Sequence, residues 1–95
     1  MQMIKLLENN YSLIENHKEG FDLKATENLI TEYFKDYDYI VGDWAYNKLR
    51  LKGFCNKENS LFNSYNDYSK VKEYLKNDCA FECKYFILKK EDSND

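Results

Sequence analysis

The sequence of residues 37–54 is Tyr-Asp-Tyr-Ile-Val-Gly-Asp-Trp-Ala-Tyr-Asn-Lys-Leu-Arg-Leu-Lys-Gly-Phe, and this stretch predicts a central β-hairpin. Its first strand, Tyr37–Trp44, is rich in the aromatic and β-branched residues that suit a half-buried, pleated surface. Ile40 and Val41 are adjacent, so they place apolar side chains on both faces of that strand. Gly42 lies inside the strand, where glycine is typical of a bulge or of the close approach of another group.

The second strand of this hairpin alternates strictly between apolar and basic residues. Leu49 and Leu51 point to one face, and the basic side chains point to the other: Lys48, Arg50 and Lys52. Asn47 tolerates a positive φ, so residues 45–48 are predicted to connect the two strands as a tight turn.

The motif Asp-Tyr-Ile-Val-Gly-Asp-Trp at residues 38–44, followed by Leu-Arg-Leu-Lys-Gly-Phe at residues 49–54, resembles the core signature of the YutD-like family of small bacterial proteins. The resemblance extends over most of the chain, from Tyr11 to Lys90, and includes these further segments: Glu15-Asn16-His17-Lys18, Gly20-Phe21, Cys79-Ala80-Phe81-Glu82-Cys83 and Tyr85-Phe86-Ile87-Leu88-Lys89-Lys90. It implies the fold of that family and a cytosolic bacterial setting, and it points to no particular activity.

Length and charge pattern limit the class of protein. Ninety-five residues fit one domain, which we assign to residues 1–90, and an acidic tail at residues 91–95 is predicted to be disordered. The tail holds three of the 17 acidic residues, so residues 1–90 carry 14 acidic and 14 basic side chains and no net charge. A strongly basic nucleic-acid-binding protein is therefore excluded, and a site for nucleic acid would have to be local.

Hydropathy and cysteine usage predict a cytoplasmic protein. No apolar run approaches the roughly 20 residues that span a bilayer, so no membrane association is expected, and the beginning of the sequence lacks a secretory signal pattern. The three cysteines, Cys55, Cys79 and Cys83, are odd in number and widely spaced, unlike the disulfide framework of a secreted domain.

The remaining segments predict an α+β fold with the element order ββ-α-ββ-α-β, in which the sheet is largely antiparallel and the helices pack on one face. Apolar segments at residues 3–7 and 11–15 favour a β-hairpin that turns at residues 8–10, with a continuous helix as the alternative. Asp22 is a suitable N-cap for a helix that runs to about Phe34.

Downstream of the central hairpin, residues 55–64 are polar and are interpreted as a mobile connection. Asn66 or Asp67 can cap a second helix that ends near Asn77, with an apolar inner face formed by Tyr68, Val71, Tyr74 and Leu75. The last predicted strand, Tyr85–Lys90, has three apolar residues in succession, Phe86, Ile87 and Leu88, which suits a central position in the sheet.

Cys79 and Cys83 are the first candidates for chemistry because they are four residues apart. We interpret them first as buried structural thiols, then as a regulatory disulfide pair, and last as metal ligands. A metal site would need about four nitrogen or sulfur ligands, and Cys55 and His17 would have to complete it. A redox pair is more often Cys-x-x-Cys at a helix N-terminus, whereas this pair follows a helix C-terminus.

Two other ionisable residues could act in catalysis, but each has a simpler interpretation. His17 is the only histidine and has no nucleophile or carboxylate at motif spacing, so a solvated or backbone-bonded role is favoured over a general base. Asp43 lies beside Trp44 on an aromatic strand, and an ion pair with Arg50 across the hairpin is favoured over catalysis.

The basic side chains of the second hairpin strand, together with an aromatic residue of the turn, form the candidate binding site: Tyr46, Lys48, Arg50 and Lys52. Such a surface suits an acidic protein partner or RNA with stacked bases, and a protein partner is favoured. Basic residues on a strand can also be a solvated face that prevents edge-to-edge pairing. We expect a non-enzymatic binding or regulatory module with no catalytic residue, cofactor or metal site. The alternative is a thiol-based redox sensor or thiol-dependent enzyme that uses Cys79 and Cys83.

Overall fold

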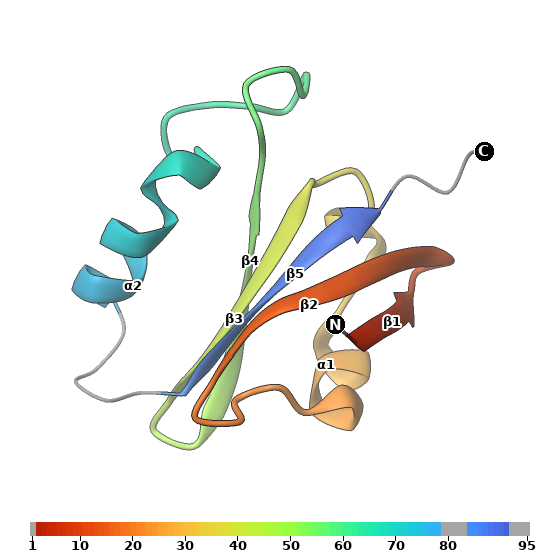
Figure 1. Ribbon diagram of the computed structural model, residues 1–95, viewed down its shortest axis with the longest axis vertical. Helices are drawn as coiled ribbons and strands as arrows, with labels where there is room; N and C mark the ends of the chain where they lie inside the picture. Colours follow the sequence, from red (N-terminus) through yellow and green to blue (C-terminus); the bar gives the residue numbers. More distant parts are fainter. Residues whose placement is uncertain (1, 79–83, 92–95) are drawn as a thin grey trace.

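Five strands form one antiparallel sheet in the computed structural model, which describes residues 2–78 and 84–91 (Figure 1). The strands are β1 (Gln2–Leu6), β2 (Asn9–His17), β3 (Tyr39–Ala45), β4 (Lys48–Phe54) and β5 (Tyr85–Glu91). They lie in the order β1-β2-β5-β3-β4, so the sheet consists of two hairpins with the last strand inserted between them. With two α-helices added, the predicted α+β class and antiparallel sheet are confirmed.

Strand β5 occupies the middle of the sheet, as its run of three apolar residues predicted. It pairs with β2 on one side and with β3 on the other, and Phe86, Ile87 and Leu88 are fully buried. The strand continues to Glu91, whose Oε2 accepts a hydrogen bond of 2.5 Å from the Ser12 hydroxyl. Glu91 therefore belongs to the sheet, whereas the other residues of the predicted tail, 92–95, lie outside the described residues.

Both hairpins turn through two residues in the left-handed region, the geometry of a type I′ turn. In the β3–β4 hairpin these are Tyr46 and Asn47, with φ of 54° and 65°, so the predicted turn at residues 45–48 is confirmed. In the β1–β2 hairpin they are Leu7 and Glu8, also at 54° and 65°. That turn comes earlier than the prediction at residues 8–10, because Asn9 and Asn10 already pair with β1.

The first helix is shorter than predicted. Asp22 caps it as expected, with its side chain accepting a hydrogen bond of 3.0 Å from the Ala25 amide, but α1 spans only Leu23–Leu29. Ile30 and Thr31 are β-branched and adopt extended conformations, which ends the helix, and a separate 3₁₀ turn, η1, follows at Glu32–Phe34.

The second helical segment follows the prediction more closely. Asp67 caps the 3₁₀ turn η2 (Tyr68–Lys70) by accepting a hydrogen bond of 3.0 Å from the Ser69 amide, and α2 (Val71–Asp78) continues from it. The predicted inner face is confirmed, because all four of its members pack in one cluster: Tyr68, Val71, Tyr74 and Leu75.

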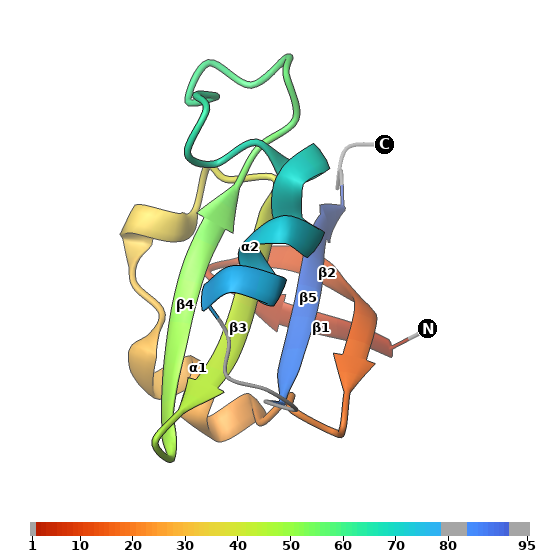
Figure 2. The ribbon, with the colours of Figure 1, turned by 90° about the vertical axis from the view of Figure 1, so that its left-hand side faces the viewer.

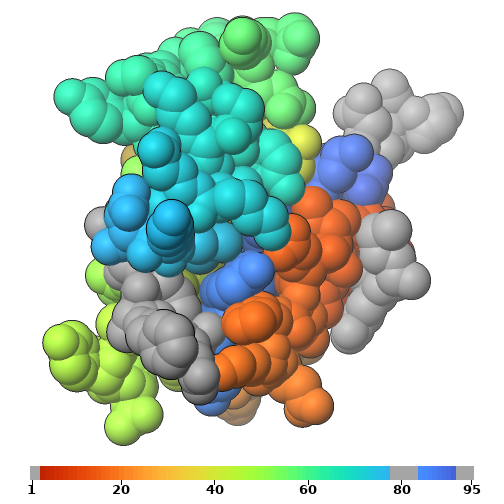
Figure 3. Space-filling view, turned by 60° about the vertical axis from the view of Figure 1, so that its left-hand side comes forward, coloured from red at the N-terminus to blue at the C-terminus, as the bar shows by residue number. Residues whose placement is uncertain are grey.

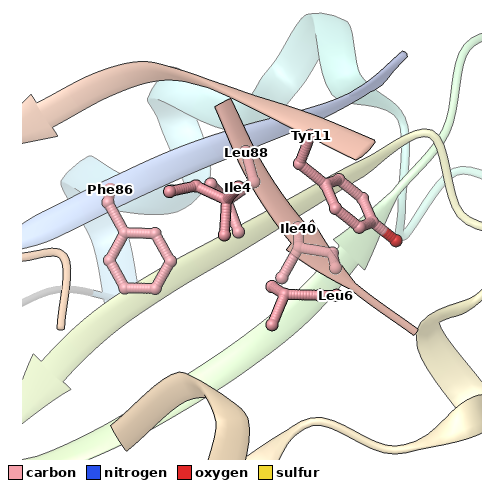
Figure 4. Packing of buried hydrophobic residues seen from close by; sticks show 6 residues of the cluster. All are labelled: Ile4, Leu6, Tyr11, Ile40, Phe86 and Leu88. Atoms are coloured by element: carbon pink, nitrogen blue, oxygen red, sulfur yellow. The ribbon is translucent and has the colours of Figure 1, made fainter. Parts of the chain in front are cut away.

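The helices lie on opposite faces of the sheet, so the prediction that they share one face is wrong (Figure 2). On the α1 face, Ile40, Phe86 and Leu88 join residues of β1 and β2 in one buried cluster (Figure 4). On the α2 face, Val41 and Ile87 pack with Val71 and Leu75. The physical reason is in the sequence, since consecutive apolar residues on β3 and β5 must bury both faces of the sheet.

The ring of Phe86 on β5 fills the space over Gly42 on β3. The two residues are cross-strand partners. A Cβ atom at residue 42 would be 2.2 Å from Cζ of Phe86 and 2.4 Å from Cε2. The predicted close approach of another group to Gly42 is therefore confirmed, and that group is an aromatic ring.

Replacing Gly42 with alanine is expected to destabilise the fold by about 1–3 kcal/mol, because the fully buried Phe86 ring must move or the two strands must separate. Denaturant unfolding followed by circular dichroism measures the change. Adding Phe86→Leu to Gly42→Ala should cost less than the sum of the two single changes, since the smaller side chain makes room. Strict additivity of the two substitutions would contradict this interpretation of the contact.

Candidate functional site

Four ionisable or aromatic side chains form a row across the α2 face of the sheet, one from each of four neighbouring strands. His17 of β2 is paired with Tyr85 of β5, Tyr85 is paired with Asp43 of β3, and Asp43 is paired with Arg50 of β4. Residues in direct register on an antiparallel sheet project to the same side, so the alternation of each strand brings these four together. The next row, which contains Val41 and Ile87, is covered by α2.

Asp43 and Arg50 form the ion pair that the sequence favoured. Arg50 donates from Nη2 to one carboxylate oxygen at 2.6 Å and from Nε to the other at 3.3 Å. The Asp43 side chain is only 1% exposed, whereas that of Arg50 is 48% exposed. The Arg50 guanidinium therefore neutralises the buried Asp43 carboxylate, and the Arg50 side chain is still partly exposed at the surface. This geometry gives Asp43 a structural role in the hairpin.

Substituting Arg50 with methionine is expected to cost roughly 2–3 kcal/mol, because a buried carboxylate loses two charge-assisted hydrogen bonds. The cost is below that of a wholly buried pair, since Arg50 is half exposed. Unfolding of Arg50→Met, Asp43→Asn and the double variant forms a double-mutant cycle. The double variant should lose less stability than the sum of the two single losses, because each substitution alone breaks the same pair; strict additivity would show that Asp43 and Arg50 are not coupled.

The other half of the row is tied to helix α2. Lys72 of α2 donates a hydrogen bond of 2.7 Å to Oε1 of Glu15, and the hydroxyl of Tyr85 donates to the same oxygen at 3.0 Å. The hydrogen bond to Glu15 raises the pKa of Lys72. Burial, and then the same acceptor, raise the pKa of Tyr85. His17 is exposed and stacks on the Tyr85 ring at 4.8 Å, and its carbonyl accepts a hydrogen bond from Gly20.

The predicted basic face is present, but only part of it projects freely into solvent. Lys48, Arg50 and Lys52 share the α2 face of β4, as their alternation predicted. Arg50 is paired with Asp43. Lys52 is half-buried, and its Nζ lies 5.2 Å from the centroid of the Phe54 ring and 4.8 Å from that of Tyr74 on α2. Its charge is thus held over two aromatic rings. Lys48 is exposed.

The tip of the β3–β4 hairpin projects from the body of the molecule (Figure 3). Tyr46 lies in the turn and not on the sheet face, and its side chain is 98% exposed. On the other side of the hairpin, the exposed Lys84 places its Nζ 5.2 Å from the centroid of the Trp44 ring. The indole of Trp44 donates a hydrogen bond of 2.7 Å to the Gly20 carbonyl and so fastens the hairpin base to the β2–α1 connection.

A tyrosine-lined pocket beside β4 was missed by the sequence interpretation. Its volume is about 220 Å³, and it is lined by Tyr33, Phe34, Tyr37, Leu51, Lys52, Gly53, Asn63, Tyr65 and Asn66. Tyr33 and Tyr65 are 67% and 83% exposed. The sequence predicts residues up to Phe34 as helix and residues 55–64 as a connection, and neither pattern indicates that the tertiary fold brings these two segments together at the pocket.

Tyr37 is the most firmly placed ring of this pocket. Its ring lies over Gly53, where a Cβ atom would be 2.4 Å from Cδ2, and its hydroxyl donates a hydrogen bond of 3.0 Å to the hydroxyl of Tyr33. Donation of the proton stabilises the neutral phenol, so the hydrogen bond to Tyr33, followed by burial, raises the pKa of Tyr37 to about 12.

Removing the acceptor by Tyr33→Phe should return the pKa of Tyr37 toward its ordinary value of 10. The raised pKa stabilises the folded state below pH 10, and this contribution disappears as the pH rises from 10 toward 12. Spectrophotometric titration of tyrosinate in the wild-type protein, in Tyr33→Phe and in Tyr37→Phe measures the change. The titration step that Tyr37→Phe removes belongs to Tyr37; if Tyr33→Phe leaves the pKa of that step unchanged, the hydrogen bond is not the cause.

Of the three cysteines, the structure describes Cys55. Cys79 and Cys83 lie outside the described residues. Cys55 is a buried free cysteine, and burial raises the pKa of its thiol, which disfavours the reactive thiolate. Within residues 2–78 and 84–91, no three His, Cys, Asp or Glu side chains gather in a way that could hold a metal ion. Neither helix in this part of the chain has the length and apolar character needed to cross a membrane.

The fold and this surface define a small α+β domain with the ion pairs Asp43–Arg50 and Glu15–Lys72 on one face of its sheet, a basic edge strand and exposed tyrosines. The sequence matches the family described as "Putative antitoxin YutD-like" over residues 5–89, and the chain belongs to this family. The resemblance that residues 38–54 indicated is confirmed.

A sequence comparison and a structural comparison agree with this assignment. The chain is 39% identical over 88 residues to "Putative antitoxin YutD" of Bacillus subtilis (strain 168), an alignment that covers 93% of this chain and 97% of the relative. The solution NMR structure of protein yutD from B. subtilis superposes with a TM-score of 0.81 at 36% identity, covering 100% of this chain and 86% of that one.

Proposed function

We propose that this chain is a non-enzymatic binding protein that acts by holding an acidic protein partner at the β3–β4 hairpin. The description "putative antitoxin", printed for the family and for the B. subtilis relative, fits a protein that acts through binding. The ionisable groups that could have served catalysis support the same view, because Asp43, Glu15 and Lys72 are engaged in ion pairs within the fold.

The observation that carries the proposal is the state of Tyr46. A non-glycine residue in the left-handed region costs about 1 kcal/mol, and type I′ turns prefer Asn-Gly. Tyr46 adopts this conformation with a φ of 54°, yet the residue is 98% exposed, so its ring packs against almost nothing in the described part of the chain. Tyrosine offers a large, rigid contact area with a polar end, which is why it is common at interfaces. Lys48, two residues further on, adds an exposed cation.

A protein partner fits this surface better than RNA does. A phosphate backbone is held by several cations along a track, with aromatic rings for the bases. Of the three basic residues on β4, Arg50 already neutralises Asp43 and Lys52 lies over Phe54 and Tyr74. Few cations are thus available for a phosphate track, whereas a single lysine beside an exposed tyrosine suffices for one part of a protein interface. The thiol alternative for Cys79 and Cys83, and a cytoplasmic location, stay predictions.

Reversing the charge at residue 48 tests the proposal. Lys48→Glu is expected to abolish capture of the partner from a native lysate, while the free energy of unfolding changes by no more than about 0.5 kcal/mol because the side chain is exposed. Lys5→Glu is the matched control, since Lys5 is an exposed lysine on β1 at the opposite edge of the same sheet. Lys52 is unsuitable here because its substitution would also remove two cation–π contacts.

Tyr46→Asn, a second variant in the same experiment, separates binding from folding. Asparagine tolerates the left-handed region, so this variant should be at least as stable as the wild type and should still lose partner affinity. Nuclease treatment of the lysate should leave capture unchanged. Loss of the partner after nuclease treatment, or equal loss from Lys48→Glu and Lys5→Glu, would overturn the proposal.

A further inference from the structure

Strand β4 is the last strand on its side of the sheet, and among the described residues no strand pairs with its outer edge. Just beyond the end of β4, Cys55 forms an isolated parallel bridge with Asp67, so the open edge is that of β4 itself. An open edge presents backbone N–H and C=O groups that can pair with another extended chain. Natural proteins usually blunt such an edge. Here the means of protection is charge, because every second residue from Lys48 to Lys52 is basic.

The basic residues of β4 determine which kind of strand can pair with its edge. An antiparallel copy of the same strand would bring lysine and arginine side chains opposite one another, and like charges in direct register are unfavourable. An acidic strand would meet opposite charges instead. The edge is thus closed to self-association and open to an extended segment with carboxylates on the α2 face, where they would oppose Lys48 and Lys52.

The other face of β4 offers a different surface. Leu49, Leu51 and Gly53 alternate with the basic residues and point to the α1 face. There the pocket of about 220 Å³ lies between η1 and the loop that follows β4. Its walls include the rings of Tyr33, Tyr37 and Tyr65, and Lys52 is the one charged residue among those that line it.

Hydrogen bonds of asparagine side chains hold the loop side of the pocket in place in the unbound protein. Asn63 accepts hydrogen bonds from the Tyr65 amide at 2.8 Å and from the Asn66 amide at 3.1 Å, and Asn66 accepts one from the Asn63 amide at 2.8 Å. The Asn59 side chain donates to the Asp36 carbonyl at 2.9 Å, which links this loop to the η1 side. These hydrogen bonds hold the connection that follows β4 in one arrangement, and a pocket arranged before binding loses less conformational entropy when it is filled.

We propose that β4 accepts an extended segment of a partner protein as a sixth strand. This segment alternates between acidic residues, which face Lys48 and Lys52, and apolar or aromatic residues, one of which enters the tyrosine pocket. Backbone pairing supplies affinity in this mode of recognition, and pockets for alternate side chains supply specificity. Tyrosine and asparagine around the pocket are the residue types that dominate protein-binding surfaces built on loops. The inference rests on the proposed function and names how the partner is held.

A synthetic peptide tests the mechanism without knowledge of the partner. The probe is about as long as the seven residues of β4, alternates glutamate with leucine and tyrosine, and is titrated into the full chain labelled with ¹⁵N. Binding should protect alternate β4 amides from hydrogen exchange. N-methylation of one alternate set of peptide residues should weaken binding at least about tenfold, because paired N–H groups are lost, whereas N-methylation of the other set should have little effect.

Side-chain variants locate the two faces of the same interaction. Tyr65→Ala should weaken peptide binding several-fold, while Tyr65→Phe, which keeps the ring, should retain it; both are compatible with folding because Tyr65 is 83% exposed. Lys48→Glu should weaken binding of the glutamate peptide, whereas the control Lys5→Glu should not. A peptide with lysine in place of glutamate should not bind.

Several outcomes would overturn strand addition while leaving the proposed function intact. If the captured partner depends on Lys48 and Tyr46 but β4 amides stay unprotected in its complex and Tyr65→Ala has no effect, the hairpin tip binds in another way. If the glutamate and lysine peptides bind equally, or both N-methylated sets bind equally, the peptide does not form a sixth strand. The opposite result is also distinguishable. If no protein partner is captured although the peptide pairs with β4 as described, the proposed function fails, whereas strand addition at the edge of β4 is supported.

Discussion

The contact between the Phe86 ring and Gly42 is the constraint on which the rest of the structure depends. The two residues are cross-strand partners, and the space that a side chain would take at residue 42 is filled by the ring. This contact sets β5, the last strand in the sequence, against β3 in one register. Because β5 also pairs with β2, the N-terminal hairpin takes its place only when the C-terminal strand is present. The most distant parts of the chain therefore fold together.

A sheet with both faces buried decides where polar side chains can lie. Consecutive apolar residues on β3 and β5 fill a cluster under α1 and another under α2. Polar residues are left to the end of the sheet beyond α2 and to its outer strands. The row of His17, Tyr85, Asp43 and Arg50 occupies that end, and the buried carboxylate of Asp43 is compatible with it because Arg50 reaches in from the edge. The pairing stabilises the hairpin that carries the candidate binding residues.

The surface that remains is suited to recognition. Tyr46 projects from the hairpin tip, lysine follows it on an edge strand, and three tyrosines surround a pocket on the other side of that strand. None of these side chains supports the two core clusters. Membership of the YutD-like family, whose description includes the word antitoxin, agrees with a protein whose work is done by contact with another molecule.

Local patterns in the sequence determined most of the strands, turns and helix caps, because each of these depends mainly on residues that are close together in the chain. The alternation of β4, the turn at Tyr46 and Asn47, the Asp22 cap and the apolar run of β5 could all be predicted, and so could the Asp43–Arg50 pair within one hairpin. Only the tertiary structure decided which face each helix covers, that β4 is an edge strand, and that Lys52 lies over Phe54 and Tyr74. The tyrosine pocket also belongs to this second group, since it joins η1, β4 and a loop that are far apart in the sequence. Periodicity reports how a segment is buried, but it does not identify the distant segment that buries it.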